Sequence, residues 1–420
     1  MRNNITVGIH TLGCRVNMYE SCAIAERLQE CGITVKKDGD CDFYIVNTCA
    51  VTAESERKSR QLVRRSAKKG KVLVIGCSAQ IEPALAEIDN VIYVGGNCNK
   101  MSVVDVILNG SERVNCVCEI ENAPYEEIKL NGTGELFSEC RAFVKIQDGC
   151  NGKCTYCIIP KCRGRVRSRN ADDIISEVKR LVANGYHEVI LTGIEVGAYN
   201  KIRLHELIKM ISCVDGIERI RLGSLSPNII TESFLSVISQ IPSFMHHIHL
   251  SLQSCNDEVL GLMMRPYKKK DIIERIALIR KYLPDCMISA DIIVGFPGET
   301  EEYFLETLEA LKELRIFHLH SFPYSERKGT PAAVMPNSVP KHIRSERNAR
   351  LISACAETKN EILSTKIGCD FTVLVEKIEN GIAVGHTNEF FEARFNADCI
   401  SVGDIVEITA ISHDGNCILA

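Results

Sequence analysis

Four cysteines lie close together in the segment CNGKCTYCIIPKC: Cys150, Cys154, Cys157 and Cys162. Four thiolates could enclose a zinc ion or an iron–sulfur cluster completely and act as a structural staple. Three thiolates could instead hold a cluster and leave one of its irons open for chemistry. The first three cysteines have the spacing Cys-x3-Cys-x2-Cys, whereas zinc sites usually combine two separated pairs. This spacing allows a three-cysteine loop around a cubane cluster and leaves the part played by Cys162 open.

A second set of cysteines shares one position relative to the strands that we predict. Cys14, Cys49 and Cys77 each end an apolar run, in HTLGC, IVNTC and VIGC. Parallel strands point the same way, so residues that follow them meet at one edge of the sheet, where open α/β sheets bind ligands. Three thiolates suit an iron–sulfur cluster better than magnesium or calcium. The alternative is three separate core cysteines, because Cys is also a small apolar residue.

The composition is that of an ordinary soluble globular protein except for its cysteines. The chain has 420 residues, 45% hydrophobic and 25% charged, and this length predicts two or three domains. It contains 21 cysteines, and in a reducing cytosol such an excess points to metal or redox chemistry more than to disulfides. The start of the chain has no signal-peptide layout, and no apolar run approaches the roughly 18 residues of a membrane span. We therefore expect a cytoplasmic protein with no membrane segment.

An α/β fold of several domains is predicted to position these cysteines. Residues 1–130 alternate short apolar runs with helical patterns, which predicts a parallel sheet covered by helices. Residues 136–364 hold six further apolar runs between helical segments, which predicts a (β/α)6 partial TIM barrel with active-site residues after its strands. This part ends in a long helical connector from Lys341 to Ser364. Residues 365–420 have short strands broken by Asn-Gly and Gly, which predicts a small antiparallel β-barrel.

The segment CNGKCTYC resembles the cluster-binding loop of radical S-adenosylmethionine (SAM) enzymes. Over essentially the whole chain, other segments resemble the radical SAM methylthiotransferases: TLGCRVN, NTCAVT, IGC, CIIP, RGRVRSR, LTGIEVG, HIHLSLQS, DIIVGFPGET and FPYSERKGTPA. This resemblance implies SAM and two [4Fe–4S] clusters. The cluster on Cys150, Cys154 and Cys157 would cleave SAM to a radical. The second cluster, which would carry the sulfur of the methylthio group, is implied to lie on Cys14, Cys49 and Cys77.

The resemblance also implies a substrate and partners. TLGCRVN, LTGIEVGAY, IRLGSLSP and PYSERKGTPA are most similar to the branch that methylthiolates C2 of N6-threonylcarbamoyladenosine beside the tRNA anticodon. Isopentenyladenosine in tRNA and a ribosomal-protein aspartate are alternative substrates within the family. An electron donor of the flavodoxin or ferredoxin type and a sulfur donor would be further partners. A reading from a different class is a non-catalytic iron–sulfur protein that binds RNA or carries electrons.

Candidate SAM contacts follow the predicted barrel strands. In the family a side chain at the position of Tyr156 lies on the adenine, and Glu195 is placed to meet the SAM amino group. Glycines and a proline beyond the fifth strand would leave room for a ligand. The complete set is Tyr156, Gly193, Ile194, Glu195, Gln253, Gly295, Pro297 and Gly298. His247 and His249 lie two apart in one strand and hence on one face, where we expect a core or substrate-lining role more than metal binding.

Two basic runs are candidates for tRNA contact. Residues 57–71 hold eight Lys or Arg and no acidic residue, and residues 161–169 hold five and none. In an extended chain the alternating arginines of the second run would face one side and bind phosphates: Arg163, Arg165, Arg167 and Arg169. The C-terminal segment resembles a TRAM domain, usually an RNA-binding module, but residues 366–420 hold three Lys or Arg against nine Asp or Glu. Relatives usually carry a small residue where Cys162 stands, so we interpret Cys162 as a packing residue.

Overall fold

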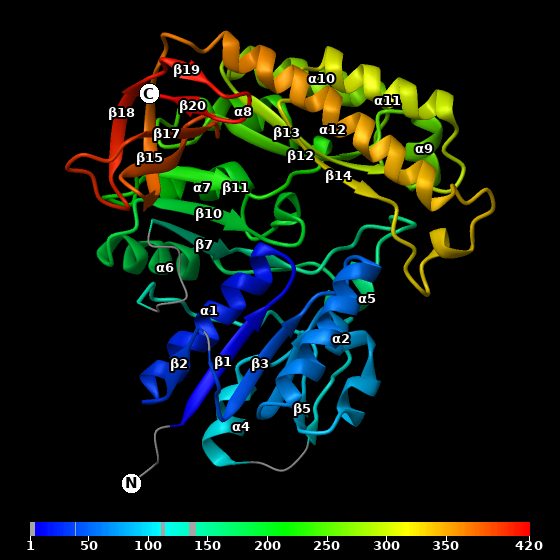
Figure 1. Cartoon of the computed structure of the whole chain (residues 1–420), viewed down its shortest axis with the longest axis vertical. Coiled ribbons are helices and arrows are strands. Elements are labelled where there is room, and N and C mark those ends of the chain that lie inside the picture. The colour runs from blue at the N-terminus through cyan, green and yellow to red at the C-terminus, as the bar shows by residue number, and fades with distance from the viewer. Residues whose placement is uncertain (1–4, 38, 111–113, 134–139) are drawn as a thin grey trace.

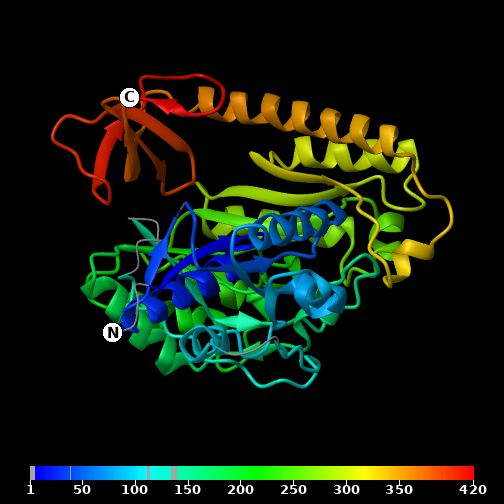
Figure 2. The ribbon, with the colours of Figure 1, turned by 60° about the horizontal axis from the view of Figure 1, so that its bottom comes forward.

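The computed structural model describes residues 5–37, 39–110, 114–133 and 140–420. The predicted start of the first domain, residue 1, and that of the second, residue 136, lie outside the described residues. Figures 1 and 2 show an N-terminal α/β unit packed against the open side of a curved central sheet, with a C-terminal β unit at one end of that sheet. In the described residues, no helix is long and apolar enough to cross a membrane.

The N-terminal unit is a six-stranded sheet of order β2-β1-β3-β4-β5-β6 in which every pair is parallel. The predicted parallel sheet covered by helices is therefore confirmed. Its central strands read as continuous apolar runs because helices cover both faces. Its elements are β1 (Thr6–Thr11), α1 (Arg15–Glu30), β2 (Thr34–Lys36), β3 (Phe43–Thr48), α2 (Ala53–Ala67), β4 (Lys71–Gly76), α3 (Cys77–Ile81), η1 (Pro83–Glu87), β5 (Val91–Val94), α4 (Ser102–Asn109) and β6 (Val114–Asn115).

The central unit has the six predicted parallel strands in two three-stranded sheets, β11-β10-β7 and β12-β13-β14. Parallel bridges from Ile220 to Phe244 and from Leu225 to Leu250 join β11 to the next sheet, so the strands form a partial barrel. Its strands are β7 (Arg141–Lys145), β10 (Glu188–Thr192), β11 (Arg219–Leu222), β12 (His247–Gln253), β13 (Met287–Val294) and β14 (His318–Pro323), with a small hairpin of β8 (Gln147–Asp148) and β9 (Arg167–Ser168).

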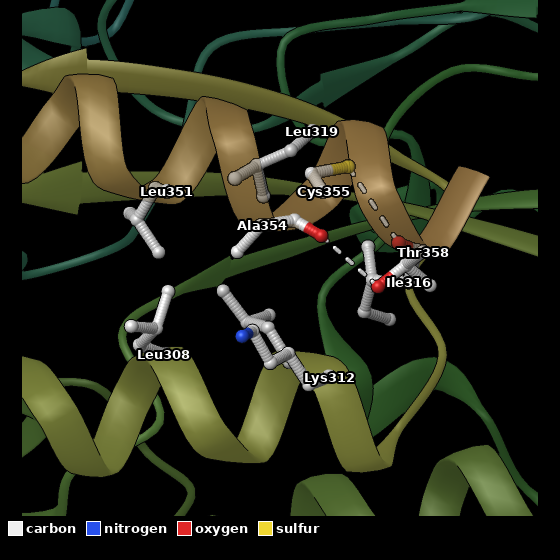
Figure 3. Close-up of a pocket in the computed structure, with 9 residues that line it drawn as sticks. Leu308, Lys312, Ile316, Leu319, Leu351, Ala354, Cys355 and Thr358 are labelled. Atoms are coloured by element: carbon white, nitrogen blue, oxygen red, sulfur yellow. Dashed lines mark hydrogen bonds between the residues drawn. The ribbon is translucent and has the colours of Figure 1, made fainter. Parts of the chain in front are cut away.

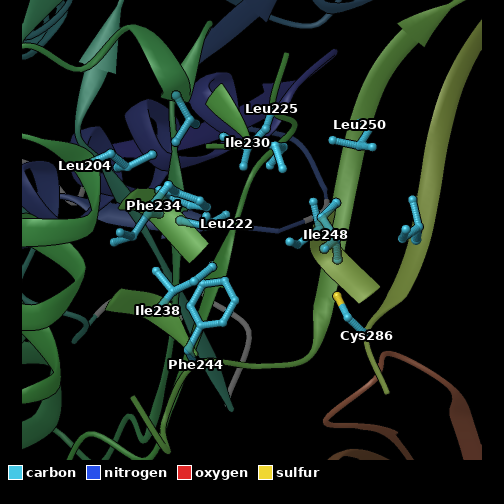
Figure 4. Packing of buried hydrophobic residues seen from close by; sticks show 14 of the residues in the cluster. Leu204, Leu222, Leu225, Ile230, Phe234, Ile238, Phe244, Ile248, Leu250 and Cys286 are labelled. Atoms are coloured by element: carbon cyan, nitrogen blue, oxygen red, sulfur yellow. The ribbon is translucent and has the colours of Figure 1, made fainter. Parts of the chain in front are cut away.

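Helices cover the outer face of this barrel. They are α6 (Ala171–Ala183), α7 (Leu204–Ser212), α8 (Glu232–Ile238), α9 (Asp257–Leu262), α10 (Lys269–Tyr282), α11 (Glu301–Glu313) and α12 (Lys341–Ser364), with single turns η2 (Val196–Ala198), η3 (Pro227–Ile229) and η4 (Pro331–Val334). The short helix α5 (Ile159–Arg163) packs instead against α3 of the N-terminal unit. The predicted connector is thus helix α12. The largest core lies between strands and helices, and Figure 4 shows Leu222, Phe234 and Phe244 on one side of the view and Ile248 and Leu250 on the strand opposite.

A small apolar pocket lies between α11 and α12, away from the cysteine loops (Figure 3). Leu308, Leu351 and Cys355 are among the residues that line it. Its volume of about 10 Å³ is hardly enough for one water molecule. It is therefore a packing gap where α12 rests on the barrel, and not a ligand site.

The C-terminal unit is a curled six-stranded sheet of order β18-β15-β16-β17-β20-β19. Its strands are β15 (Asp370–Glu379), β16 (Ile382–Thr387), β17 (Glu392–Asn396), β18 (Ile405–Thr409), β19 (Ser412–His413) and β20 (Ile418–Leu419). The prediction of a wholly antiparallel barrel is wrong in one respect, because β17 and β20 are parallel. Since β18 occupies one edge, beside β15, the final hairpin adds at the other edge, and the sheet remains a half-barrel with β18 and β19 unjoined.

The C-terminal unit closes the end of the barrel at which the strands begin. Glu188 lies inside that end and accepts hydrogen bonds from Arg219 Nε at 2.7 Å and Arg221 Nε at 3.1 Å. The same two arginines donate to the end of β16, Arg219 to the carbonyl of His386 at 3.0 Å and Arg221 to that of Thr387 at 2.7 Å. The opposite end, where the strands finish, stays open to the cysteine loops.

Candidate active site

The loop with Cys150, Cys154 and Cys157 begins directly after β8, at the open end of the barrel, and the three side chains are half-buried. The backbone N–H of Gly152 donates to Cys150 Sγ at 3.2 Å, and Arg265 Nη1 donates to Cys154 Sγ at 3.2 Å. Donors aimed at sulfur stabilise thiolates, the form in which cysteine binds metal. Burial raises the pKa of Cys157 to about 12, so bound iron would have to displace its proton.

Glu195 lies beside this loop with an unused oxygen. Its Oε1 is buried and has no hydrogen-bond partner among the described residues, and burial raises the pKa of the carboxyl group. The carboxylate is close enough to Cys150 to raise the pKa of that thiol. A buried carboxylate oxygen without a partner is costly unless a donor or cation pairs with it. The ammonium group of SAM would be such a cation, so the residues present fit this cofactor.

Tyr156 and Gln253 line one wall of the same region. The Tyr156 ring packs edge-on against Phe296, with centroids 6.3 Å apart, and its other side faces a cavity. Gln253 ends β12 with a φ of 67°, a conformation that few residues other than glycine adopt. Such strain is typical of functional positions, and Gln253 lines the cavity.

The glycines predicted to leave room for a ligand instead pack against protein. A Cβ on Gly295 would lie 2.3 Å from Arg344 Cγ, and one on Gly298 would lie 2.9 Å from a Leu262 methyl group. Pro297 is buried beside them. The expectation of open space there is therefore wrong, because α12 and α9 fill it.

The space beside Gly193 is likewise filled by protein, in this case by Gln147. A Cβ on Gly193 would lie 2.9 Å from Gln147 Oε1. The same oxygen accepts from the backbone N–H groups of Ile194 at 3.0 Å and Glu195 at 2.9 Å. Gly193 thus positions Glu195 through Gln147, a residue to which nothing in the sequence pointed.

The second cysteine set converges as predicted at the edge of the N-terminal sheet. Cys14 precedes α1, Cys49 follows β3, and Cys77 begins α3, and their thiols are close enough to shift one another's pKa. Gly13 has a φ of 100°, and a Cβ on it would lie 2.8 Å from Cys49 Sγ. Only glycine therefore allows the Cys14 loop to approach Cys49 this closely.

Buried cations surround this set. A hydrogen bond from the Cys162 thiol, together with Arg163 and Lys100, lowers the pKa of Cys77 to about 5. Among the described residues, Lys100, Lys145 and Arg163 lie against two carboxylates, Glu20 and Asp148, and all five are almost fully buried. One positive charge of these five groups is thus left over beside the cysteines, and Arg167, 3.7 Å from Asp148, adds to it. A cluster held by thiolates is anionic, so this surplus fits it.

The predicted row of exposed arginines is wrong. Arg163 is fully buried, and Arg169 is buried in ion pairs with Glu127 and Glu177. Arg167 is half-buried and donates to the Arg163 carbonyl at 2.9 Å. Only Arg165 is exposed, and it pairs with Glu121 at 2.8 Å. The arginines do not share a face because residues up to Arg163 are helical, which breaks the two-residue repeat of an extended chain.

Cys162 connects the two cysteine sets instead of standing apart from them. It is fully buried in a cluster with Ala50, Cys77 and Ile158. Its thiol hydrogen-bonds Cys77 and also lies within electrostatic range of Cys157. Its backbone carbonyl accepts from Asn97 Nδ2 at 2.8 Å. Its packing role agrees with the prediction, but its neighbour is a candidate ligand.

One cavity of about 300 Å³, which we call the central cavity, lies between the two cysteine sets. Thr52, three residues after Cys49, lines it from the N-terminal unit, and Tyr156 and Cys157 line it from the barrel loop. Gln253, Asp291 and Tyr324 are among the barrel residues that complete it. This volume suits a small ligand of about the size of a nucleoside.

A histidine network extends from the central cavity into the barrel. His249 Nε2 lies 3.0 Å and His320 Nδ1 3.5 Å from Asp291 Oδ1, and Ser289 Oγ lies 2.8 Å from both His249 Nδ1 and His247 Nε2. If His247 donates to Ser289 and Ser289 donates to His249, then His249 Nε2–H faces Asp291. Burial opposes ionisation of Asp291, but these hydrogen bonds outweigh it and lower its pKa. Both predicted histidines are thus buried and hydrogen-bonded.

The sequence carried little signal for the supporting residues. Asp291 stood inside the recognised segment DIIVGFPGET without a role assigned to it, and His320 lies just before FPYSERKGTPA. Arg265, in GLMMRPYK, belongs to no motif, and Glu20 lies in an ordinary helical pattern. For Glu20, the one available sign was a carboxylate at a helix position where a core residue would otherwise be expected.

Comparisons with known proteins cover the whole chain. Residues 144–311 match the model of the radical SAM superfamily, and residues 6–95 match that of "Uncharacterized protein family UPF0004". The threonylcarbamoyladenosine tRNA methylthiotransferase MtaB of Bacillus subtilis is 35% identical over 96% of this chain and 93% of its own. The MtaB of Thermotoga maritima is 36% identical over 98% and 96%.

A second group of relatives and one solved structure complete the comparison. The tRNA-2-methylthio-N(6)-dimethylallyladenosine synthase of Aquifex aeolicus is 32% identical over 96% of this chain and 95% of its own. The radical SAM methyltransferase TsrM of Kitasatospora setae, solved with cobalamin and a [4Fe–4S] cluster, aligns with a TM-score of 0.59 over 79% of this chain and 74% of its own. At 15% identity this likeness concerns the fold alone.

Proposed function

The chain belongs to the radical SAM tRNA methylthiotransferases, and we propose that it adds a methylthio group to C2 of N6-threonylcarbamoyladenosine in tRNA. It is an enzyme that uses SAM and two [4Fe–4S] clusters. Relatives named for threonylcarbamoyladenosine and for dimethylallyladenosine are both similar to it, and those named for the first substrate have the higher identity among those given above. The tRNA substrate is used in the cytoplasm, where we expect the enzyme to act.

The observation that carries this proposal is the position of the central cavity between two cysteine sets. Methylthiolation needs a radical generator and a sulfur source at the same carbon atom. Cys150, Cys154 and Cys157 would hold the cluster that, with SAM, would supply the radical, and Cys14, Cys49 and Cys77 would hold the cluster that would supply the sulfur. A structural staple or an electron carrier would have no use for a nucleoside-sized cavity between them.

The chain's own residues orient the reactants and exclude water. Glu195 would hold the SAM ammonium group, and Tyr156 and Gln253 would lie along its adenosyl part. Arg265 donates a hydrogen bond to Cys154 Sγ and so fixes its orientation. The backbone N–H of Ala53 donates to Ser325 Oγ at 2.9 Å, which closes one rim of the cavity between the two units.

The exposed face of α2 is our candidate for the tRNA phosphate contact. Arg64 and Arg65 are exposed there, and α2 begins directly after Thr52 on the cavity wall. The C-terminal sheet would be the TRAM-like module, with a minor share of the RNA contact because its net charge is negative. A flavodoxin or ferredoxin would supply electrons, and a separate donor would restore the sulfur.

Reconstitution of both clusters without oxygen, followed by product analysis, tests this function. The wild-type enzyme should release deoxyadenosine and convert threonylcarbamoyladenosine in an anticodon stem-loop RNA to its methylthio derivative. Cys157→Ala should abolish both products, whereas Cys49→Ala should bind about half the iron, still cleave SAM and form no methylthio product. SAM cleavage that survives in both variants would contradict the assignment. A deletion strain with unchanged methylthio-threonylcarbamoyladenosine would exclude this substrate.

A further inference from the structure

Arg15, the first residue of α1, is a cation inside the barrel without an anionic partner. It directly follows Cys14 in the chain, and its guanidinium lies 5.8 Å from the centre of the inward-facing Phe143 ring. It makes no hydrogen bond or ion pair with any described residue. Its side chain remains solvent-accessible although protein surrounds it, as expected for a group that projects into a cavity.

The charges around Arg15 leave room for one more anion. Asp291 and Glu188 are the carboxylates that stabilise its charge, and Arg141 opposes it. Glu188 is already shared by Arg141, Arg219 and Arg221, and Asp291 by two histidines. None of the carboxylates within its range is therefore free to pair with Arg15.

Two histidines near Arg15 are neutral and do not change this charge balance. His247 has its pKa lowered by burial first and then by Arg221, His249 and Arg15, so it is neutral. His318 is also neutral, because burial and His320 lower its pKa to about 4. The barrel interior thus has a surplus cation, and that cation is Arg15.

We propose that Arg15 binds the carboxylate of the threonylcarbamoyl group, with Asp291 accepting a hydrogen bond from the same tail. This inference rests on the proposed function and assigns the residues that select its substrate. Asp291 lines the central cavity and lies within electrostatic range of Arg15, so the N6 tail of an adenine in the cavity could reach both. A bidentate bond between a guanidinium and a carboxylate is strong and directional.

The same arrangement disfavours the alternative tRNA substrate. An isopentenyl tail is apolar, so it would displace water from Arg15 and offer neither Arg15 nor Asp291 a polar group. Sites built for polar groups reject analogues that lack them far more strongly than apolar pockets reject extra polar groups. The polar wall thus explains a preference between two substrates that differ only in their N6 tail.

The test compares charge removal on the enzyme with charge removal on the substrate. The holoenzyme, with both clusters reconstituted, is assayed on anticodon stem-loop RNAs that carry threonylcarbamoyladenosine or its threonine methyl ester. Arg15→Gln should lower kcat/KM for the acid roughly 10- to 100-fold, mainly through KM, and should change kcat/KM for the ester less than about 3-fold. Arg15→Lys should retain part of the activity on the acid. Lys270→Gln, which removes an exposed cation on α10, is the matched control and should behave like wild type.

Each outcome of this test decides the matter. Equal losses on acid and ester in Arg15→Gln would overturn the proposal, as would wild-type enzyme that uses the ester as well as the acid. The second result needs no variant and so does not depend on the folding of Arg15→Gln. A raised KM for SAM, measured by deoxyadenosine formation without RNA, would assign Arg15 to the SAM carboxylate and likewise overturn it. Wild-type enzyme inactive on both RNAs would instead refute the proposed function.

Discussion

Replacement of Glu20 by glutamine should loosen the contact between the N-terminal unit and the barrel. Glu20 lies on α1 and pairs with Lys145 Nζ at 2.7 Å, with Arg163 Nη1 at 3.1 Å and with Lys100. These four side chains are at most 3% exposed. In Glu20→Gln the three buried cations would face Asp148 alone. Removing one partner from a buried ion pair costs about 3–5 kcal/mol, and we expect this range here.

Hydrogen exchange followed by mass spectrometry measures this loss locally, which matters because a chain of several domains need not unfold in one step. Amides of α1 and β7 in Glu20→Gln should exchange at least about 100-fold faster than in wild type. Glu30→Gln is the matched control on the same helix. Glu30 pairs with Arg27 at 2.9 Å, but both side chains are about half exposed, so its loss should cost less than about 1 kcal/mol.

A double variant tests the charge count itself. Adding Lys100→Met to Glu20→Gln restores the wild-type surplus of one positive charge. The double variant should therefore be more stable than the sum of the single effects by about 0.5–3 kcal/mol. Strict additivity, or exchange in Glu20→Gln as slow as in Glu30→Gln, would refute the reasoning.

Three further predictions concern packing and pH. Gly295→Ala should lower the free energy of unfolding by about 1–3 kcal/mol, because φ is 69° and the new Cβ would meet Arg344. Gly261→Ala, in a helix with open space around it, should instead raise the free energy of unfolding by about 0.4–1 kcal/mol. Chemical denaturation measures both changes. Cys162→Ala should lower the free energy of unfolding by about 1 kcal/mol and keep the iron of both clusters, and iron analysis showing the loss of one cluster would contradict this. Because the folded-state pKa of His318 lies at about 4, below the 6.5 of the unfolded chain, its contribution to stability is complete above pH 6.5 and declines as the pH falls toward 4. Thermal unfolding at pH 7 and 5 should therefore show a smaller difference in His318→Asn than in wild type.

The sequence predicted the cysteine sets and the strands before them because both depend on local pattern. Cys49 and Cys77 follow apolar strands of one parallel sheet, so their convergence follows from chain direction alone. The partners of Arg163 could not be predicted in the same way. Its carboxylate partner Glu20 is 143 residues away, and only the packing of two units brings them together.

The glycines show the same limit in another form. Gly295 was expected to leave space for a ligand, but α12, about fifty residues later, places Arg344 there. A missing side chain signals a close approach without saying what approaches. The role of Arg15 could not be predicted for a related reason, because it depends on the absence of an anionic partner in the folded protein.

The hydrogen bonds that join the barrel to the C-terminal sheet have a consequence for synthesis of the chain. Glu188 and its arginines form early, but the carbonyls of His386 and Thr387 that complete their hydrogen bonds belong to the last tenth of the sequence. Domains generally fold in order as the ribosome releases them. The end of the barrel at which the strands begin therefore keeps unpaired polar groups until translation is nearly finished. We expect chains that terminate early near residue 365 to fail as folded enzymes, so a premature stop would yield degraded protein and not a partly active one.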